Sequence, residues 1–245
     1  MTTSVRYISG GLLGDFIHQL SVIHETYLTT GRRGILYLSD HVGDRFKYGA
    51  TRAYMDISSI LQQQPAIESV SVHAGESYDI NLSQWRSSPL VFRANWNIIY
   101  KTTYGADWGR HAWLTLPAVA RNSTDRILVN ISYQYGHRIP TYNLPSLFSQ
   151  YPSEQLHFLC QDRKEYEAFE KATGVHMNCL VAGSLEELCV HIQGCKLFIG
   201  NLSSPLALAH AMHIPNITLV HKGACDTPHM IGLETLYPSM QILGT

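Results

Sequence analysis

Two short segments combine polar side chains with the glycine, serine or proline residues of a turn between a strand and a helix. The first is Ser9-Gly-Gly-Leu-Leu-Gly-Asp15, between an apolar run and a helical pattern. The second is Gly200-Asn-Leu-Ser-Ser-Pro205, in the same setting. Open α/β sheets bind their ligands at the carboxyl ends of strands, so both turns are candidate sites.

Asp15 has the clearest chemistry of the first turn. At the start of a helix the helix dipole stabilises its carboxylate as the anion, while Gly11 and Gly14 leave open space beside it. An ionised carboxylate in a cleft can act as a general base. Aspartate is equally common there as a helix cap, worth about 0.5–2 kcal/mol. The turn alone leaves base and cap open.

The first turn also partly matches a dinucleotide-binding fingerprint. Gly11 and Gly14 take the second and third glycine positions, but Ser9 stands in the first. Asp40 ends the next predicted strand, where a ribose-binding acid would lie. Against this, Asp15 would compete with the pyrophosphate for the helix N-terminus. A nicotinamide-dependent oxidoreductase using the Gly11/Gly14 turn stays as an alternative.

The second turn predicts an anion-binding helix end, with Ser204 as N-cap and Pro205 as the first helical residue. Because proline has no amide hydrogen, the donors for a diphosphate would be two hydroxyls and the next two amides. They belong to Ser203, Ser204, Leu206 and Ala207. A normally capped core helix is the alternative, and His210 is expected to pack inside it.

Further polar residues extend both candidate sites. Arg138 and Lys222 each follow a predicted strand and would stabilise a departing diphosphate, or lie in solvated loops. Asp162 would accept from a ribose hydroxyl or cap the helix that follows it. Aromatic faces and forked donors suit sugars, and four residues of the first half would form an acceptor surface unless they pack in the core. They are Arg93, Trp96, Arg110 and His111.

The elements that must position these residues form two alternating series. The first contains strands at 5–9, 35–38, 69–73 and 90–94, helices at 15–30 and 57–64, and a loop-rich aromatic stretch. The second has strands at 126–132, 156–160, 178–181, 196–200 and 216–221, with helices at 163–173, 185–193 and 205–213. We expect an α/β protein of two Rossmann-like βαβ domains, residues 1–122 and 123–245, facing across a cleft.

Composition supports a globular protein. Of 245 residues, 45% are hydrophobic and 15% charged, with a formal net charge of −1, which excludes a disordered chain or a coiled coil. Balanced charges give no general attraction for nucleic acid or anionic lipid. With no signal segment or apolar span evident, we expect a cytoplasmic protein without a membrane span. Five cysteines without C-x-x-C spacing are expected to be reduced.

Both turns resemble one known family. Leu13-Gly-Asp-Phe16 and the segment from Gly200 to Val220 are similar to matching segments of the ADP-heptose:lipopolysaccharide heptosyltransferases, inverting glycosyltransferases of the GT-B fold. The resemblance implies that Asp15 is the catalytic base. Where that family usually has Asp-Ser/Thr-Gly followed by a histidine, this chain has Leu202, Ser203, Ser204 and Ala207. The sugar of the donor therefore stays open.

We accordingly expect an inverting glycosyltransferase that uses a nucleotide-diphosphate sugar and a glycan or other hydroxyl acceptor. No D-x-D triplet and no spacing typical of metal ligands occurs, so we expect no metal and no other cofactor. A non-catalytic module that binds nucleotide sugars or glycans is the second alternative.

Overall fold

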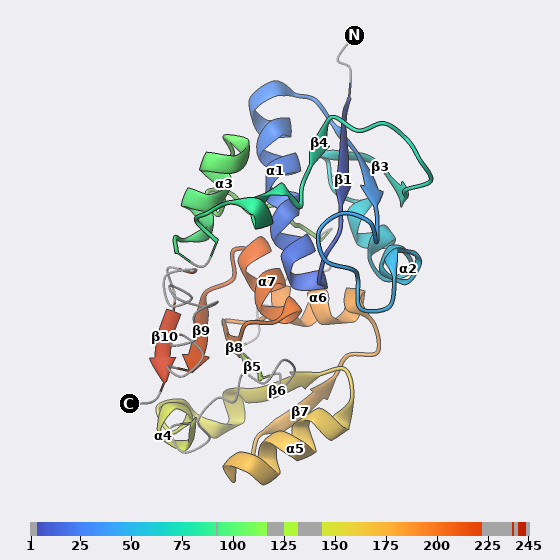
Figure 1. Ribbon diagram of the computed structural model, residues 1–245. Helices are drawn as coiled ribbons and strands as arrows, with labels where there is room; N and C mark the ends of the chain where they lie inside the picture. Colours follow the sequence, from blue (N-terminus) through green and yellow to red (C-terminus); the bar gives the residue numbers. More distant parts are fainter. Residues whose placement is uncertain are drawn as a thin grey trace.

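Two parallel β-sheets, each flanked by helices, organise the chain (Figure 1). They are seen in a computed structural model, which describes residues 4–91, 93–116, 125–131, 144–221, 237 and 240–243. The α/β architecture with two sheets of Rossmann type confirms the predicted fold class. The predicted boundary at residue 122 lies outside the described residues.

The N-terminal sheet has the strand order β3-β2-β1-β4. Its strands are β1 (Val5–Ser9), β2 (Gly34–Leu38), β3 (Ile67–Val72) and β4 (Ile80–Asn81). Its helices are α1 (Leu13–Thr30), α2 (Ala50–Leu61), α3 (Trp96–Tyr104) and the 3-10 helix η1 (Gln84–Ser87). Strands β2 and β4 lie on opposite sides of β1, so the chain reverses its winding direction beside the carboxyl end of β1.

The C-terminal sheet has the order β10-β9-β8-β5-β6-β7. Its strands are β5 (Ile127–Asn130), β6 (Leu156–Cys160), β7 (Asn178–Val181), β8 (Leu197–Asn201), β9 (Asn216–His221) and β10 (Met240–Leu243). Its helices are α4 (Leu144–Phe148), η4 (Ser153–Gln155), α5 (Arg163–Thr173), α6 (Leu185–Gln193) and α7 (Ser204–Ala211). When the strands are numbered in chain order with β5 as strand 1, the sheet has the 3-2-1-4-5-6 order of dinucleotide-binding sheets. The chain reverses its winding direction between β5 and β8.

One hydrophobic core joins the two sheets. Helix α1 packs along α7, and α2 packs against α6, so apolar side chains of both halves form a single cluster. Phe16 and Ile17 of α1 belong to it, as do Leu206 and Ala207 of α7. A second cluster lies around Phe158 on the other face of the C-terminal sheet. The two sheets are therefore held together by buried apolar surface.

An aromatic cluster lies at the junction of α1, α3 and α7. His18 is buried, its Nε2 lies 2.6 Å from the Tyr237 hydroxyl, and its ring lies 5.0 Å from the Trp96 ring. The His210 ring stacks on Tyr237 with 4.4 Å between centroids. Burial lowers the pKa of His18 and lowers the pKa of His210 to about 3, so both rings are neutral near pH 7. The expected packing role of His210 is confirmed.

Most predicted elements of the C-terminal half are confirmed, whereas several of the N-terminal half are wrong. The residues around 90–94 that the structure describes form turns, and the two-residue β4 pairs with β1 instead. Helix α3 lies within the stretch expected to be loop, where the Asn95 side chain caps it by accepting from the Ile98 amide at 2.9 Å. Helix α2 begins at Ala50 and ends before the predicted helix does. Strand β10 and helix α4 were not predicted.

Two further expectations concern thiols and membranes. Cys160, Cys179, Cys189 and Cys195 are free thiols, as predicted, and Cys225 lies outside the described residues. Among the helices that the structure describes, none combines the length and the apolar character needed to cross a bilayer.

Candidate active site

The first turn lies where the N-terminal sheet reverses its winding. Gly10 directly follows β1, and Ser83 follows the neighbouring β4. The Ser83 Oγ accepts from the Gly10 amide at 3.1 Å and donates to the Gly10 carbonyl at 3.0 Å. The turn is therefore tied to the carboxyl ends of two adjacent parallel strands, the position where such sheets bind ligands.

The second turn occupies the equivalent place in the C-terminal sheet. Ser203 follows β8, and its Oγ donates to the Asn130 side-chain oxygen, at the end of β5, over 3.3 Å. Ser203, and not the predicted Ser204, is the N-cap of α7, with Pro205 as its second residue. Each of the two turns thus lies at the reversal point of its own sheet.

The cap of α7 changes which groups are free to bind an anion. The Leu206 amide donates to Ser203 Oγ at 3.4 Å, and the Ala207 amide donates to the Ser203 carbonyl at 3.1 Å. The two amides predicted as donors for a diphosphate are therefore engaged within the chain. The Ser204 hydroxyl makes no hydrogen bond to the described residues and stays available at the helix end.

The two turns meet because α1 and α7 pack side by side. A methyl group placed on Gly14 would lie 3.6 Å from the Ser203 carbonyl group and 3.6 Å from the Ser204 Cα. These are ordinary van der Waals distances, so the start of α1 lies close to the start of α7. Asp15 is the next residue of α1 after this contact.

The Asp15 carboxylate forms an ion pair with Arg86 of η1 and caps no helix. The N-cap position of α1 is Leu12, with no side-chain cap hydrogen bond, and Asp15 Oδ2 instead accepts from Arg86 Nη2. Arg86 Nη1 in turn lies 2.5 Å from Asp44 Oδ2, so the guanidinium bridges two carboxylates. Asp15 is therefore not the N-cap of α1, and its interpretation as a helix cap is wrong.

The environment of Asp15 acts on its proton affinity in two directions. Burial raises the pKa of the Asp15 carboxyl above its ordinary value, and the Arg86 charge opposes that rise. The Asp44 charge adds a smaller upward contribution to the same pKa. The side chains of Asp15 and Arg86 both stay 24% exposed, so the carboxylate is accessible as well as partly desolvated. Such a group can take a proton from a bound hydroxyl.

Two predicted nucleoside-binding acids serve as helix caps. Asp162 accepts from the Lys164 amide at 3.0 Å and caps α5. Asp40 accepts from the Ala50 amide, the first residue of α2, at 2.8 Å. Both carboxylates therefore have structural roles. Asp40 Oδ2 is engaged in this way, whereas the buried Asp40 Oδ1 has no hydrogen-bond partner among the described residues.

The predicted acceptor residues have different surroundings in the structure. Trp96 is buried in the aromatic cluster, which corrects its placement on an acceptor surface. His111 pairs with Glu25 over 2.8 Å, and Arg110 lies 3.5 Å from Asp107. Arg93 is exposed in a turn. Arg138 and Lys222, predicted to stabilise the diphosphate, lie outside the described residues.

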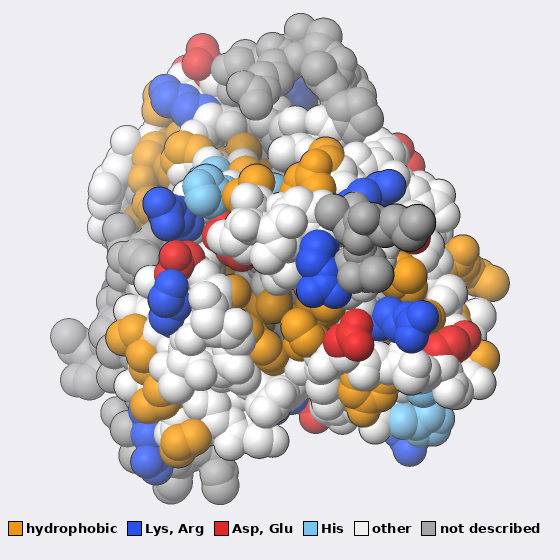
Figure 2. All heavy atoms as spheres, turned by 90° about the horizontal axis from the view of Figure 1, so that it is seen from above, with side chains coloured by type: hydrophobic (Ala, Val, Ile, Leu, Met, Phe, Trp, Pro, Cys, Tyr) orange, Lys and Arg blue, Asp and Glu red, His pale blue; other side chains and the backbone are white. Residues whose placement is uncertain are grey.

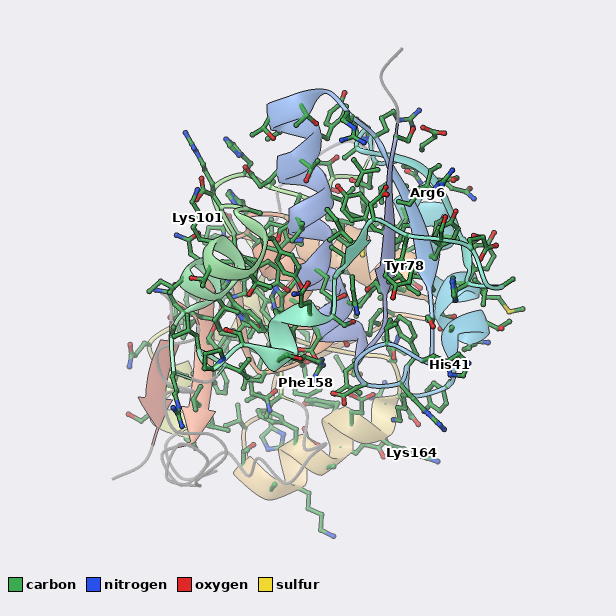
Figure 3. The ribbon with its side chains drawn as sticks, turned by 45° about the horizontal axis from the view of Figure 1, so that its top comes forward. Arg6, His41, Tyr78, Lys101, Phe158 and Lys164 are labelled. Atoms are coloured by element: carbon green, nitrogen blue, oxygen red, sulfur yellow. The ribbon has the colours of Figure 1, made fainter. Side chains whose placement is uncertain are left out.

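The loop between β2 and α2, residues 39–49, borders a hollow of about 430 Å³ near the first turn. It is lined by Asp40, His41, Arg45, Phe46, Lys47 and Gly49. In Figure 3 the labelled His41 of this loop and Lys164 of α5 lie at the same edge of the molecule. The Lys47 charge also acts on Glu165 in the first turn of α5, so this loop lies near the start of α5.

Two further observations concern the surface of the molecule and the grouping of possible metal ligands. Figure 2 shows basic and acidic side chains interspersed with apolar ones over the face seen from above. Within the described ranges, no group of three or more His, Cys, Asp or Glu side chains is arranged to hold a metal ion.

Comparison with known proteins places the fold. No protein-family model matches the chain, and no curated protein matches it. The structure of E. coli heptosyltransferase WaaC with ADP matches over 98% of this chain and 93% of WaaC, with a TM-score of 0.59 and 13% identity. A family 9 glycosyl transferase from Veillonella parvula DSM 2008 matches over 100% and 87% of the two chains, with the same TM-score and identity. E. coli ADP-heptose lps heptosyltransferase II matches with a TM-score of 0.56 and 13% identity over 98% of this chain and 90% of that one.

The chain has a GT-B-like fold. Within it, three residues of the candidate site were not singled out from the sequence: Asp44, Arg86 and Asn130. Arg86 lies 71 residues from its partner Asp15, and Asn130 lies 73 residues from Ser203. No local spacing signals such pairs. The single available hint was the position of Asn130 at the end of an apolar run, where a GT-B-like sheet presents polar groups.

Proposed function

We propose that the chain is an inverting glycosyltransferase that moves a sugar from a nucleotide-diphosphate sugar to a hydroxyl group of a glycan or other acceptor. The observation that carries this proposal is the meeting of the two turns at Gly14 and Ser203, each at the reversal point of its parallel sheet. One turn brings a partly desolvated carboxylate, and the other brings the start of a helix. We propose that the first serves as the general base and the second as the anion site.

The fold supports a sugar nucleotide as the donor. WaaC has been solved with ADP and with ADP-2-deoxy-2-fluoro heptose, and it shares this fold. We propose that the diphosphate binds at the start of α7, where the helix dipole favours an anion and the Ser204 hydroxyl is a free donor. Arg138 and Lys222 stay proposed contributors of positive charge to the leaving group, and Asp162 stays a proposed contact to the nucleoside.

In the proposed reaction Asp15 acts as general base. Its carboxylate takes the proton of the acceptor hydroxyl as that oxygen attacks the anomeric carbon of the donor. The bond from the anomeric carbon to the diphosphate oxygen breaks, and the nucleoside diphosphate leaves with the bonding electrons. Attack opposite the leaving group inverts the anomeric configuration. Charge on the diphosphate is balanced by helix dipole and side chains, so we propose a metal-independent reaction.

The first experiment identifies the nucleotide. Melting curves are recorded with ADP, GDP, UDP, CDP and NAD, since a ligand that binds only the folded chain raises Tm. The sugar conjugates of the stabilising nucleotide are then assayed for transfer to hydroxyl acceptors in excess EDTA. Binding without transfer would favour the binding-module alternative, and stabilisation by NAD alone would favour an oxidoreductase.

The second experiment replaces Asp15 by Asn. Loss of a general base lowers turnover by about 10²–10⁴-fold, while donor affinity stays close to that of the wild type. The matched control is Asp56→Asn, which breaks the exposed Arg52–Asp56 pair on α2 by the same chemical change. Turnover of Asp15→Asn equal to that of the control would refute Asp15 as base.

A further inference from the structure

Arg86 is held in place from several sides, although nothing in the local sequence marks it. It belongs to η1, whose Trp85 amide donates to the Tyr104 hydroxyl at 3.0 Å, and Tyr104 donates onward to the Leu82 carbonyl at 2.6 Å. The Arg86 guanidinium lies 4.7 Å from the centroid of the Trp85 ring. Helix α3 and a buried tryptophan thus fix its direction.

Two glycines with positive φ make the space that the guanidinium fills. Gly11 has φ +125°, and a methyl group there would lie 3.3 Å from Arg86 Nη2. Gly43 has φ +65°, and a methyl group there would lie 2.7 Å from the Ser83 Cβ and 3.6 Å from the Arg86 Cδ. Side chains at either position would crowd the arginine or its support. The glycines of the first turn and of the 39–49 loop therefore accommodate an arginine.

The bridge formed by Arg86 is asymmetric with respect to Asp15. It binds Oδ2, whereas Oδ1 makes no hydrogen bond to a residue that the structure describes. The second carboxylate, Asp44, is 58% exposed and anchors the other side of the guanidinium. One oxygen of Asp15 is thus fixed, and the other is available for a proton.

We infer that Arg86 is a positioning residue, which orients the Asp15 carboxylate through Oδ2 and keeps it ionised so that Oδ1 can accept a proton. This inference rests on the proposed function for its catalytic consequence, but the pairing itself can be tested without a substrate. Asp44 holds the guanidinium in place while Asp15 is protonated.

Among the described residues, four titratable groups act electrostatically on Asp15. Arg86 and Asp44 are described above, and the hydroxyls of Tyr100 from α3 and of Tyr237 act on it electrostatically. Burial raises the pKa of both tyrosines, so they stay neutral over the pH range of interest. Loss of the Arg86 charge leaves burial and Asp44 unopposed, and both raise the pKa of Asp15.

The test titrates the carboxyl of Asp15 by ¹³C NMR in protein labelled at aspartate carboxyl carbons. The Asp15 signal is the one absent from Asp15→Asn. In Arg86→Met its midpoint should rise by about one pH unit or more, since one opposing charge in close contact typically shifts a carboxyl by 1–3 units. The control Arg52→Met removes the arginine of the exposed α2 pair and should leave the midpoint unchanged. An unchanged midpoint in Arg86→Met would overturn the inference.

Kinetics supply the second readout. Arg86→Met should lower kcat at neutral pH by about tenfold or more, move the acidic limb of the pH profile upward, and change the donor KM little. Arg86→Lys keeps the charge but lacks the fork, so it should restore the pH profile and only part of kcat. It is also the variant to use if Arg86→Met fails to fold. If Asp15→Asn loses turnover while Arg86→Met retains the wild-type profile, the inference fails and the proposed function stands.

Discussion

Gly10 and Gly14 lie four residues apart, yet the same change to alanine should act on them in opposite directions. A methyl group on Gly10 would lie 2.1 Å from the Val42 carbonyl oxygen and 2.6 Å from that of Ser39, both backbone atoms of the loop that covers the turn. Backbone cannot rotate away as a side-chain end can. Gly10→Ala should therefore destabilise the fold by about 3 kcal/mol, at the upper end of overpacking effects.

At Gly14 the added methyl group meets only atoms at 3.6 Å, which is ordinary contact. Alanine is also the better helix former, by about 1 kcal/mol in a helix interior and less in the first turn. Gly14→Ala should therefore leave the free energy of unfolding unchanged or raise it by up to about 1 kcal/mol.

The assay is thermal unfolding of the three proteins under identical conditions. For a chain of this size 1 kcal/mol corresponds to about 2–4 °C, so Gly10→Ala should lower Tm by about 6–12 °C. Gly14→Ala should change Tm by between zero and about +4 °C. A Tm of Gly10→Ala within about 2 °C of the wild type would refute the close approach of the 39–49 loop to the first turn.

Two further predictions concern α7. Ser203→Ala removes the N-cap and should lower the free energy of unfolding by about 1 kcal/mol. Ser204→Asp should keep stability but weaken binding of the nucleoside diphosphate by charge repulsion. If Ser204→Asp binds the nucleoside diphosphate as tightly as the wild type does, Ser204 is excluded from the site. In the folded chain His18 and His210 stay neutral, whereas histidines of the unfolded chain bind protons below about pH 6.5. The unfolded state therefore binds more protons, and stability is lost as pH falls from about 6.5 towards the His210 pKa of about 3. Tm should therefore fall on acidification, and less steeply in His210→Gln; equal slopes would contradict the neutral buried ring.

The sequence alone determined the boundaries of those helices that have a capping residue directly before them and a glycine directly after them. Helix α5 begins after Asp162 and ends at Gly174, as predicted, because cap and stop lie next to the helix. The two turns and Asp15 were likewise found from neighbouring residues. The two-residue β4 was missed, because only its pairing with β1 makes it a strand.

The composition of the candidate site was decided by the tertiary structure. Arg86 reaches Asp15, and Asn130 reaches Ser203, across more than seventy positions in each case. Such partners carry no periodic or local signal, because the distance between them depends on how whole sheets and helices pack. Packing of α1 on α7 also brought the two turns together. The sequence alone singled out Asp15 as the candidate base, and the packing of the fold determined which side chains hold it.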